Sequence, residues 1–391
     1  MRFAFTEQEE RFRVEVRQWL DGNLPQDWEE VGEEGDEGAE LRQREMAKRL
    51  GERGWLAIGW PKEYGGAARP LMEQVIFKEE MSYRRAPGLN VQGPEMIGNT
   101  ILVFGSEEQK KRFLPPMSRG EVAWCQGYSE PGAGSDLASL KTRAVEDGDD
   151  LVVNGQKIWT SQAHVADWVF VGVRTDPDAP KHKGISLLVM PVKSPGLTVR
   201  PIINMANRKG LNETFYDNVR VPKANVIGEI NRGWYVMAGL LDFERSGISG
   251  FGGAQRNVEE LCDYARKAVV GGGPLIENVI VRHKLAQLMI DVGVGRMLSY
   301  RVAWMQSRGQ LPNREASQAK LFSSELSQRI ARQGCEIMGM FGIVGPGSRW
   351  AALKGRYEQA YMSSVPATIA GGTSEIQRNI IATRGLGLPR N

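Results

Sequence analysis

The stretch from Cys125 to Ser161 constrains the fold of this chain more than any other part of it. It begins with a loop-like segment, residues 128–136, which reads Tyr-Ser-Glu-Pro-Gly-Ala-Gly-Ser-Asp. A proline followed by two glycines excludes a regular helix or a central strand there. We therefore predict a shaped loop that can aim backbone N–H groups and serine hydroxyls at a ligand rich in hydrogen-bond acceptors. Taken alone, such a loop is more often a simple turn.

Two dipeptides in the same stretch are strong signals for tight β-hairpins. They are Asp147-Gly148 and Asn154-Gly155. Apolar β-branched and aromatic residues at 151–153 and 168–171 are typical of strands. We predict that the loop and the segment 157–161, Lys-Ile-Trp-Thr-Ser, belong to one antiparallel sheet.

Hydrophobic periodicity predicts three domains in a multidomain α and β protein. Residues 1–120 have a helical pattern, residues 121–230 have the two-residue period of strands, and residues 231–391 are helical again. The middle part should form a small barrel or sandwich, and the last part a four-helix bundle.

Local signals place several of the expected helices. Capping boxes begin helices after Thr6 and Ser106, and the second helix should stop at the prolines that follow Leu114. The long helices of the last domain are expected over 234–250 with an extension to 267, 275–308, 314–340, 348–362, and after Thr373.

Composition narrows the function classes. The 391 residues include 41% hydrophobic and 25% charged residues, as in an ordinary globular protein, and a net charge of +3 argues against a nucleic-acid surface. The sequence has no apolar run long enough for a membrane span and no signal-peptide pattern at its start. Its three cysteines and three histidines are scattered, so we expect reduced thiols, a cytoplasmic location and no bound metal.

Three further segments carry recognisable patterns. They are 213–222 (Glu-Thr-Phe-Tyr-Asp-Asn-Val-Arg-Val-Pro), 228–234 (Gly-Glu-Ile-Asn-Arg-Gly-Trp) and 371–378 (Gly-Gly-Thr-Ser-Glu-Ile-Gln-Arg). Together with the loop and the Lys-Ile-Trp-Thr-Ser segment, they resemble the motifs of the acyl-CoA dehydrogenase family, in the family's order and over nearly the whole chain. The resemblance implies bound FAD and α,β-dehydrogenation of an acyl-CoA thioester to a trans-2-enoyl-CoA, within fatty acid β-oxidation.

The resemblance also implies which residues contact the cofactor. Trp159 would cover one face of the flavin ring, and Ser161 would bond near its reactive nitrogen. The complete set of implied cofactor-binding residues is Tyr128, Ser129, Gly134, Ser135, Trp159, Thr160, Ser161, Glu336, Gly339, Thr373 and Glu375. Thr373 has a second reading, because a threonine or serine at this place also caps a helix.

The catalytic base is expected at Glu244. Much of the resembled family carries a glutamate directly before Gly-Thr-Ser near the C-terminus, but here that position is Gly371. A second branch, the isovaleryl- and long-chain-type enzymes, carries the base on the first bundle helix, where Glu244 lies on an apolar stripe. Ser135, Arg245, Gly371 and Gly372 are the implied substrate-binding residues, and the missing side chain at Gly371 favours a branched, cyclic or steroid-like acyl group.

The implied partners are an acyl-CoA substrate, an electron-transfer flavoprotein and further protein subunits. A homo-oligomer, either dimer or homotetramer, is expected, and a hetero-oligomer stays open. One motif departs from the family, since Arg266 is followed by Lys-Ala-Val-Val-Gly-Gly-Gly where an arginine and a Phe-Gly pair usually reach the neighbouring flavin. Two alternatives therefore remain: a flavin monooxygenase or oxidase of the same fold, and a non-catalytic subunit of a hetero-oligomer.

Overall fold

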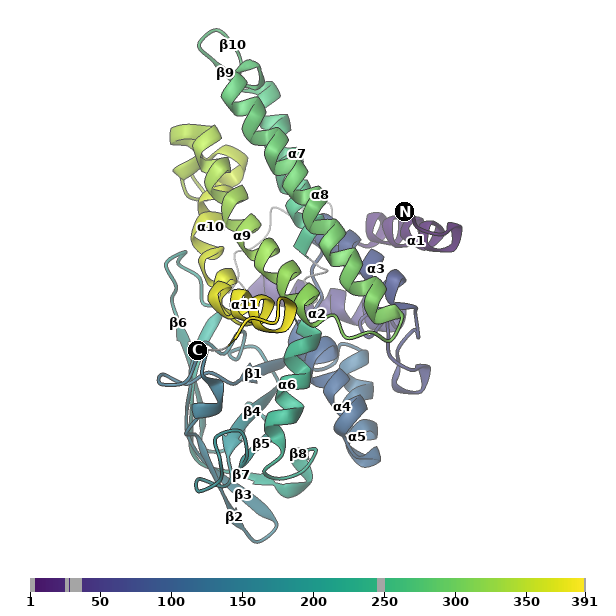
Figure 1. Cartoon of the computed structure of the whole chain (residues 1–391), viewed down its shortest axis with the longest axis vertical. Helices are drawn as coiled ribbons and strands as arrows, with labels where there is room; N and C mark the ends of the chain where they lie inside the picture. Colours follow the sequence, from purple (N-terminus) through teal and green to yellow (C-terminus); the bar gives the residue numbers. More distant parts are fainter. Residues whose placement is uncertain (1–3, 25–27, 29–36, 245–249, 390–391) are drawn as a thin grey trace. The chain divides into compact units, whose positions relative to one another are not determined.

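The structure is a computed structural model that describes residues 4–24, 28, 37–244 and 250–389 (Figure 1). The chain divides into two compact units. We call the first the bundle unit, formed by 1–29, 70–86 and 245–391, and the second the sheet unit, formed by 30–69 and 87–244. Each unit is built from separated stretches of sequence, and the helices of 1–120 are shared between the two.

The sheet unit contains eight strands among its described residues. They are β1 Trp124–Gly127, β2 Arg143–Asp147, β3 Asp150–Lys157, β4 Trp168–Arg174, β5 Ile185–Pro191, β6 Leu197–Ile202, β7 Leu211–Pro222 and β8 Val226–Ile227. The order is β6-β7-β3-β2-β4-β5-β8, with β1 paired to β4. All neighbours are antiparallel except β1–β4 and the single β2–β4 pair.

Alternation along the strands separates two cores. Phe170 and Leu187 belong to a core shared with helices of this unit. Their strand neighbours, among them Val171 and Leu188, face the other way into a core shared with β2, β3 and β7. Residues buried on both faces explain why β4 and β5 are apolar runs rather than alternating ones.

Several helices of the sheet unit pack on one face of the sheet and contribute to the core around Phe170 and Leu187. They are the π-helix Val91–Gly98, α4 Asn99–Phe104, α5 Glu107–Ser118 and α6 Gly233–Glu244, and the unit also contains α2 Glu37–Glu52. Both predicted capping boxes are present, at Thr6 in the bundle unit and at Ser106 here. The predicted stop at the prolines is wrong, because Pro115 and Pro116 lie inside the final turn of α5.

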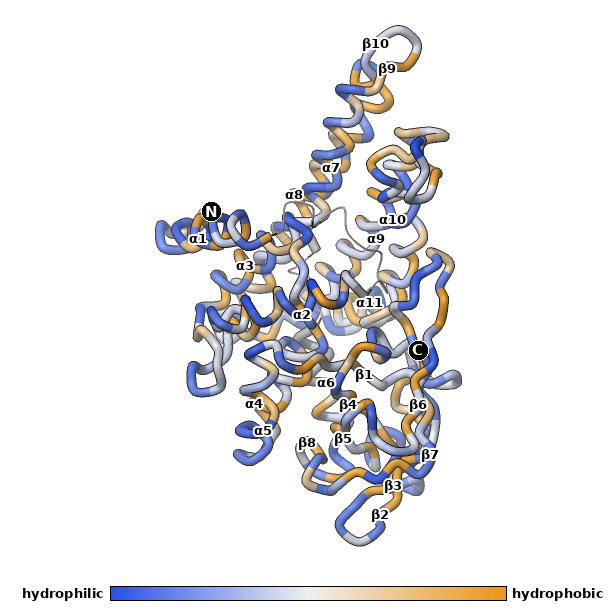
Figure 2. Tube along the Cα trace, turned by 180° about the vertical axis from the view of Figure 1, so that it is seen from behind, coloured by the Kyte–Doolittle hydropathy of each residue, from blue (hydrophilic) through white to orange (hydrophobic). Residues whose placement is uncertain are grey.

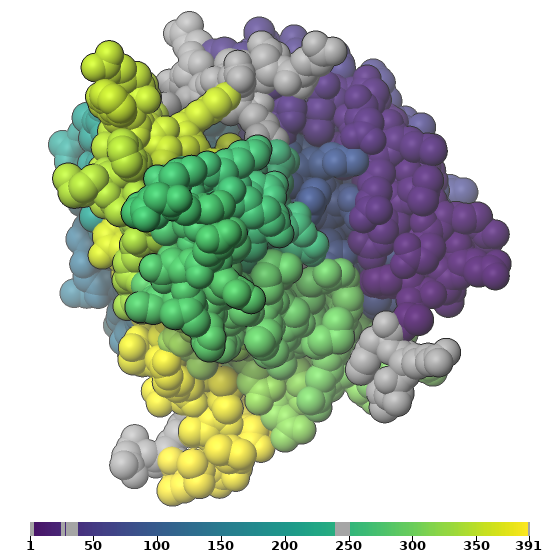
Figure 3. Space-filling model, turned by 90° about the horizontal axis from the view of Figure 1, so that it is seen from above, coloured from purple at the N-terminus to yellow at the C-terminus, as the bar shows by residue number. Residues whose placement is uncertain are grey.

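The bundle unit is helical. Its α-helices are α1 Glu7–Asn23, α3 Leu71–Tyr83, α7 Gly250–Lys267, α8 Val279–Ser307, α9 Asn313–Met338, α10 Arg356–Ser363 and α11 Ser374–Ile380. Figure 2 shows hydrophobic and hydrophilic residues alternating along α7, as expected for a helix with one buried face. Figure 3 shows α7 and α8 side by side, and both contribute to the core around Leu261, Leu285 and Tyr357.

One predicted helix of the last domain needs correction. The helix expected over 348–362 is interrupted, since Leu353 and Lys354 have φ of +47° and +58° and α10 begins only at Arg356. Between α7 and α8, outside the predicted helices, residues 269–274 form a short hairpin of β9 (Val269–Val270) and β10 (Gly273–Pro274). Both are tight-turn conformations that the helical period does not reveal.

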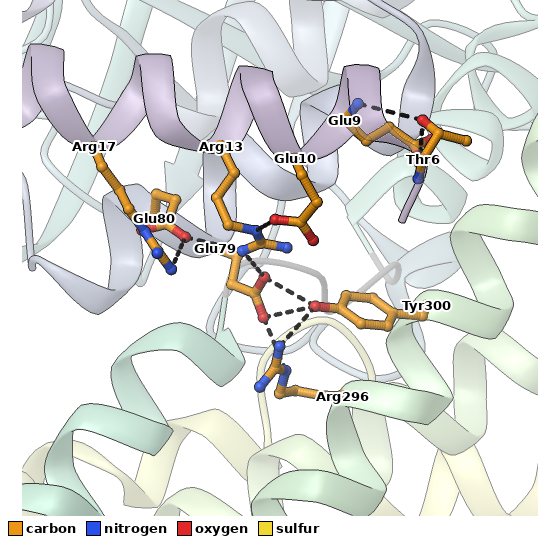
Figure 4. A network of polar contacts seen from close by, with 9 residues as sticks. All are labelled: Thr6, Glu9, Glu10, Arg13, Arg17, Glu79, Glu80, Arg296 and Tyr300. Atoms are coloured by element: carbon orange, nitrogen blue, oxygen red, sulfur yellow. Dashed lines mark hydrogen bonds and ion pairs between the residues drawn. The ribbon is translucent and has the colours of Figure 1, made fainter. Parts of the chain in front are cut away.

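A buried polar network joins α1, α3 and α8 in the bundle unit (Figure 4). Arg13 donates to Glu79 at 2.8 Å and to Glu80 at 2.9 Å, and all three side chains are less than 10% exposed. Tyr300 donates to both oxygens of Glu79, and Arg296 lies 2.9 Å from the same carboxylate. Burial opposes the charge of Arg13, but the two carboxylates raise its pKa overall.

Candidate functional site

The loop predicted at residues 128–136 is present and is closed by a bridge between Glu130 and Ala133. The N–H of Glu130 donates to the carbonyl of Ala133 at 2.9 Å, and the reverse bond measures 3.1 Å. Beyond the bridge, Gly134 and Ser135 are exposed, and a Cβ added to Gly134 would meet no heavy atom within 4 Å. The outer side of the loop therefore has room for a ligand.

Trp159 has an unusual backbone and an unusual exposure. Its φ is +63°, in the left-handed region, and its side chain is 55% exposed. A bulky non-glycine residue in this region costs about 1–3 kcal/mol, and such strain persists only when the surroundings fix it. An exposed indole held in a strained conformation indicates a surface kept ready for a flat partner.

Hydrogen bonds on both sides fix that conformation. They run from Ile158 N to Ser129 O (2.9 Å), Thr160 N to Asn212 O (2.9 Å), Gln162 N to Gly210 O (2.8 Å) and Asn212 Nδ2 to Thr160 O (2.8 Å). The first of these bonds joins the Trp159 segment directly to the loop. The structure thus brings together the seven predicted cofactor-binding residues of the sheet unit, as one loop and one adjoining turn.

Two buried oxygens beside Trp159 have no hydrogen-bond partner among the described residues. They are Oγ1 of Thr160 and Oδ1 of Asn212, and both residues are 0% exposed. A buried acceptor or hydroxyl without a partner is costly and marks a place that a ligand or water completes. Together with the open side of Gly134, these atoms fit a cofactor that has both a flat ring and polar edges.

Asn212 was not predicted as a site residue. It directly precedes the motif at 213–222, and that proximity is the only signal the sequence carries for it. Its role is visible only once β7 is placed beside the Trp159 segment.

A buried ion pair underlies the loop. Lys157, which is 0% exposed, lies 2.8 Å from Oε1 of Glu130 and donates to the carbonyl of Tyr128 at 3.1 Å. Burial lowers the pKa of Lys157 to about 8, although Glu130 opposes the shift. Burial raises the pKa of Glu130, but the charge of Lys157 and the hydrogen bonds to the carboxylate outweigh burial and bring this pKa below its usual range. We infer that both groups are charged at neutral pH.

The hairpin predicted at Asn154-Gly155 is wrong, whereas the one at Asp147-Gly148 joins β2 to β3. Strand β3 continues through Asn154, with a register irregularity against β7 between Val153 and Gly155. Gly155 has φ +152°, and a Cβ there would lie 2.6 Å from Oγ1 of Thr142. The glycine therefore serves a bulge with a close approach, not a turn.

The glycine pair of the C-terminal motif makes a tight turn in the bundle unit. Gly371 and Gly372 have φ of +64° and +91°. Gln377 donates to both of their carbonyls, and the ammonium of Lys320 donates to that of Gly372 at 2.6 Å. Thr373 then caps α11, accepting from the N–H of Ile376, so its capping role is confirmed.

Glu375 and Glu336 are exposed residues of the bundle unit. Glu375 lies in the first turn of α11, where the backbone N–H and Thr373 lower its pKa. Glu336 pairs with Lys284 at 2.5 Å, and this contact lowers its pKa. Gly339 ends α9 with φ +58°. All three belong to a different compact unit from Trp159, so their part in a shared site stays a prediction.

Glu244 is the last residue of α6, in the sheet unit. The structure does not describe its side chain, and Arg245 lies outside the described residues. The helical position expected for the base is therefore present, and its catalytic role stays a prediction.

The described residues meet the requirements neither of a metal site nor of a membrane-spanning helix. No cluster of three or more His, Cys, Asp or Glu side chains there could hold a metal ion. Every helix in these residues is too short or too polar to span a bilayer. The three cysteines are free thiols, and burial raises the pKa of each.

Comparisons with known proteins cover the whole chain. The family models for the acyl-CoA dehydrogenase N-terminal, middle and C-terminal domains match residues 6–121, 125–219 and 231–386. Acyl-CoA dehydrogenase FadE26 of Mycobacterium tuberculosis is 39% identical over 402 residues, which cover 100% of this chain and 99% of that protein.

Two solved structures are similar in both fold and sequence. The steroid ACAD Tcur3481-Tcur3483 has a TM-score of 0.92 and 36% identity, with 100% of both chains covered. The ChsE4-ChsE5 complex from Mycobacterium tuberculosis has a TM-score of 0.89 and 38% identity, again with 100% of both chains covered.

Proposed function

The chain belongs to the acyl-CoA dehydrogenase family of flavoprotein oxidoreductases, and from this membership we propose that it is a catalytic, FAD-dependent acyl-CoA dehydrogenase. The reaction removes the α-proton and the β-hydrogen of an acyl-CoA thioester and yields the trans-2-enoyl-CoA. Electrons then pass to an electron-transfer flavoprotein.

The observation that carries this proposal is the strained, exposed Trp159 beside an open loop. Its indole offers a flat apolar surface, and the next residue, Thr160, has a hydroxyl oxygen without a hydrogen-bond partner among the described residues. Ser129, Ser135 and Ser161 add hydroxyls that can bond the polar edges of a flavin. When bound, FAD supplies an acceptor for the β-hydrogen as hydride.

The remaining steps fall to side chains of this chain. We assign Glu244 as the base that takes the α-proton, supported by its place on α6 and by the glycine at 371, where the other family branch carries its glutamate. Ser135, Arg245, Gly371 and Gly372 are assigned to the acyl-CoA. Glu336, Gly339, Thr373 and Glu375 are assigned to the cofactor. We also propose the division into three domains at residues 120 and 230.

For the substrate we propose an acyl group bulkier than a straight chain, of the polycyclic kind. Gly371 leaves no side chain over the thioester, which makes room for such a group. The similarity to a steroid ACAD at 36% identity and a TM-score of 0.92 supports this choice. The two similar structures each name two proteins, which favours a hetero-oligomer over a homotetramer. A cytoplasmic location remains part of the proposal.

The test is anaerobic reduction of the bound flavin by a panel of acyl-CoAs, followed at the visible absorption band. Glu244→Gln should retain FAD and acyl-CoA binding while the reduction rate falls by about 10²–10⁴-fold. Glu229→Gln, an exposed glutamate just before α6, is the matched control and should reduce at the parent rate. Parent-like reduction by Glu244→Gln would refute the assignment of the base.

Two further results would redirect the proposal. Rapid consumption of oxygen with release of peroxide would indicate an oxidase. Flavin that binds but is reduced by no acyl-CoA, alone or with a second family member, would indicate a non-catalytic subunit.

A further inference from the structure

We propose that the buried Lys157–Glu130 ion pair is a positioning device for the cofactor, which locks the open loop and the strained Trp159 into one fixed arrangement. This inference rests on the proposed function, because it concerns how the chain holds FAD. Neither residue needs to touch the cofactor to do this.

Glu130 fixes both ends of the segment from residue 130 to residue 142, with its carboxylate at the far end and its backbone at the near end. At the far end, the N–H groups of Lys141 and Thr142 donate to its two oxygens at 2.7 and 2.8 Å. At the near end, Glu130 itself forms the bridge to Ala133. The ammonium of Lys157 is the third donor to this carboxylate, at 2.8 Å. The exposed residues between these points, including Gly134, are thus held by the side chain and the backbone of one residue, Glu130.

Lys157 connects that carboxylate to the Trp159 segment. Its ammonium also donates to the carbonyl of Tyr128, and the next residue along, Ile158, donates its N–H to the carbonyl of Ser129. The loop is therefore bonded to the last residue of β3 and to the residue after it. Trp159 follows immediately, so a shift of the loop against β3 changes where its indole stands relative to Gly134.

Burial of a charged pair at this place is informative because such a pair adds little stability of its own. Removing two charges from water costs about as much as their attraction returns, and apolar residues of similar size often stabilise a fold equally well. The desolvation of Lys157 is strong enough to lower its pKa well below that of an ordinary lysine. Each partner of this pair makes directed hydrogen bonds to a different part of the chain around the loop. We infer that the pair fixes the conformation of the loop rather than adding to the free energy of unfolding.

The experiment uses the full-length protein, stripped of cofactor, and three variants: Lys157→Met, Glu130→Gln and the double variant. The control is Lys223→Met, which breaks an ion pair of similar length (2.7 Å to Glu146) on the same sheet, where both partners are partly exposed. Three quantities are measured: the dissociation constant of FAD, the residual fluorescence of bound flavin, and amide hydrogen exchange in the FAD-free protein.

Each single variant should weaken FAD binding by about 10-fold or more, the size expected when a supporting partner of a binding group is lost. Bound flavin should fluoresce more strongly, because an indole out of place no longer quenches it. Amides of 131–140 and 158–162 should exchange faster, while those of β4 and β5 stay protected. The double variant should recover folding stability, because no charge is left buried alone, but not FAD affinity. Lys223→Met should match the parent throughout.

The outcomes separate this inference from the proposed function. Parent protein that binds no FAD refutes the proposed function and, with it, a role of the pair in holding FAD. Parent protein that binds FAD, with Lys157→Met equal to it in affinity, fluorescence and loop exchange, overturns the inference alone. A double variant with full FAD affinity would also overturn it, because the pair would then contribute only to stability.

Discussion

Removal of the carboxylate of Glu79 should destabilise the bundle unit strongly. This side chain is only 8% exposed. It accepts hydrogen bonds from Arg13 and Tyr300 and forms an ion pair with Arg296, all at 2.8–2.9 Å (Figure 4). In Glu79→Ala the guanidinium of Arg13 keeps Glu80, but two guanidiniums and a phenol lose their shared acceptor. Breaking one side of a buried ion pair typically costs about 3–5 kcal/mol, and we expect a loss of free energy of unfolding in that range.

A smaller substitution in the same network should cost less stability. Tyr300→Phe removes only the hydroxyl, which donates to Glu79 and accepts from Arg296 at 3.0 Å. Both guanidiniums stay on Glu79, so we expect a smaller loss of about 1.5–3 kcal/mol, on the scale of hydrogen bonds to charged groups. The control is Glu7→Gln in α1, whose contact with Arg11 is 4.0 Å long and fully solvated, and which should change stability by less than about 1 kcal/mol.

The assay is urea denaturation combined with amide hydrogen exchange of α1. Urea gives the free energy of unfolding, and exchange shows whether α1 loosens first, as expected if the network fixes it against α3 and α8. Glu79→Ala within 1 kcal/mol of the parent would refute the reasoning, since the network would then add nothing over solvated charges. So would protection of α1 unchanged in both Glu79→Ala and Tyr300→Phe.

Three further predictions follow from backbone strain and from a lowered pKa. Trp159→Gly should raise thermal stability by relieving strain of about 1 kcal/mol while FAD retention falls; a variant that loses stability would contradict this reading. Gly371→Ala should lower the free energy of unfolding by about 1 kcal/mol, because φ is +64°, whereas substitution of the solvated, negative-φ Gly132 should not. The pKa of Lys157 is about 8 in the folded protein, against 10.5 for an ordinary lysine. Between pH 8 and pH 10.5 the unfolded chain therefore binds more protons at this residue than the folded chain does. The free energy of unfolding should rise with pH across that range because of this group. Urea titrations should show that rise in the parent and not in Lys157→Met.

Short-range signals in the sequence predicted much of the fold correctly. The caps at Thr6, Ser106 and Thr373 depend on side chains within three residues of the helix start, and all three are present. The Asp147-Gly148 turn needs only its own two residues. The family motifs located the loop and Trp159 because each motif is contiguous in the chain.

Features set by distant partners were not predictable in the same way. Asn154-Gly155 has the composition of a hairpin turn, but pairing with β7 carries the strand through it as a bulge. Prolines are expected to end a helix, but α5 continues through Pro115 and Pro116 to Ser118. A lysine two residues before a tryptophan gives no sign of complete burial, and the hydrogen bond between Asn212 and Thr160 joins residues 52 positions apart.

The interleaving of the two compact units has a consequence for biosynthesis. The bundle unit begins with α1 and α3 but is completed only by residues after 245. While the ribosome is still translating the sheet unit, Glu79 and Glu80 can already meet Arg13 and Arg17, but Arg296 and Tyr300 do not yet exist. At about 5–20 residues per second, the nascent chain carries this half-built cluster for roughly ten seconds or more. The sheet unit, whose described strands and helices end at Glu244, can finish folding first, so the amino-terminal helices are made early and become fixed late.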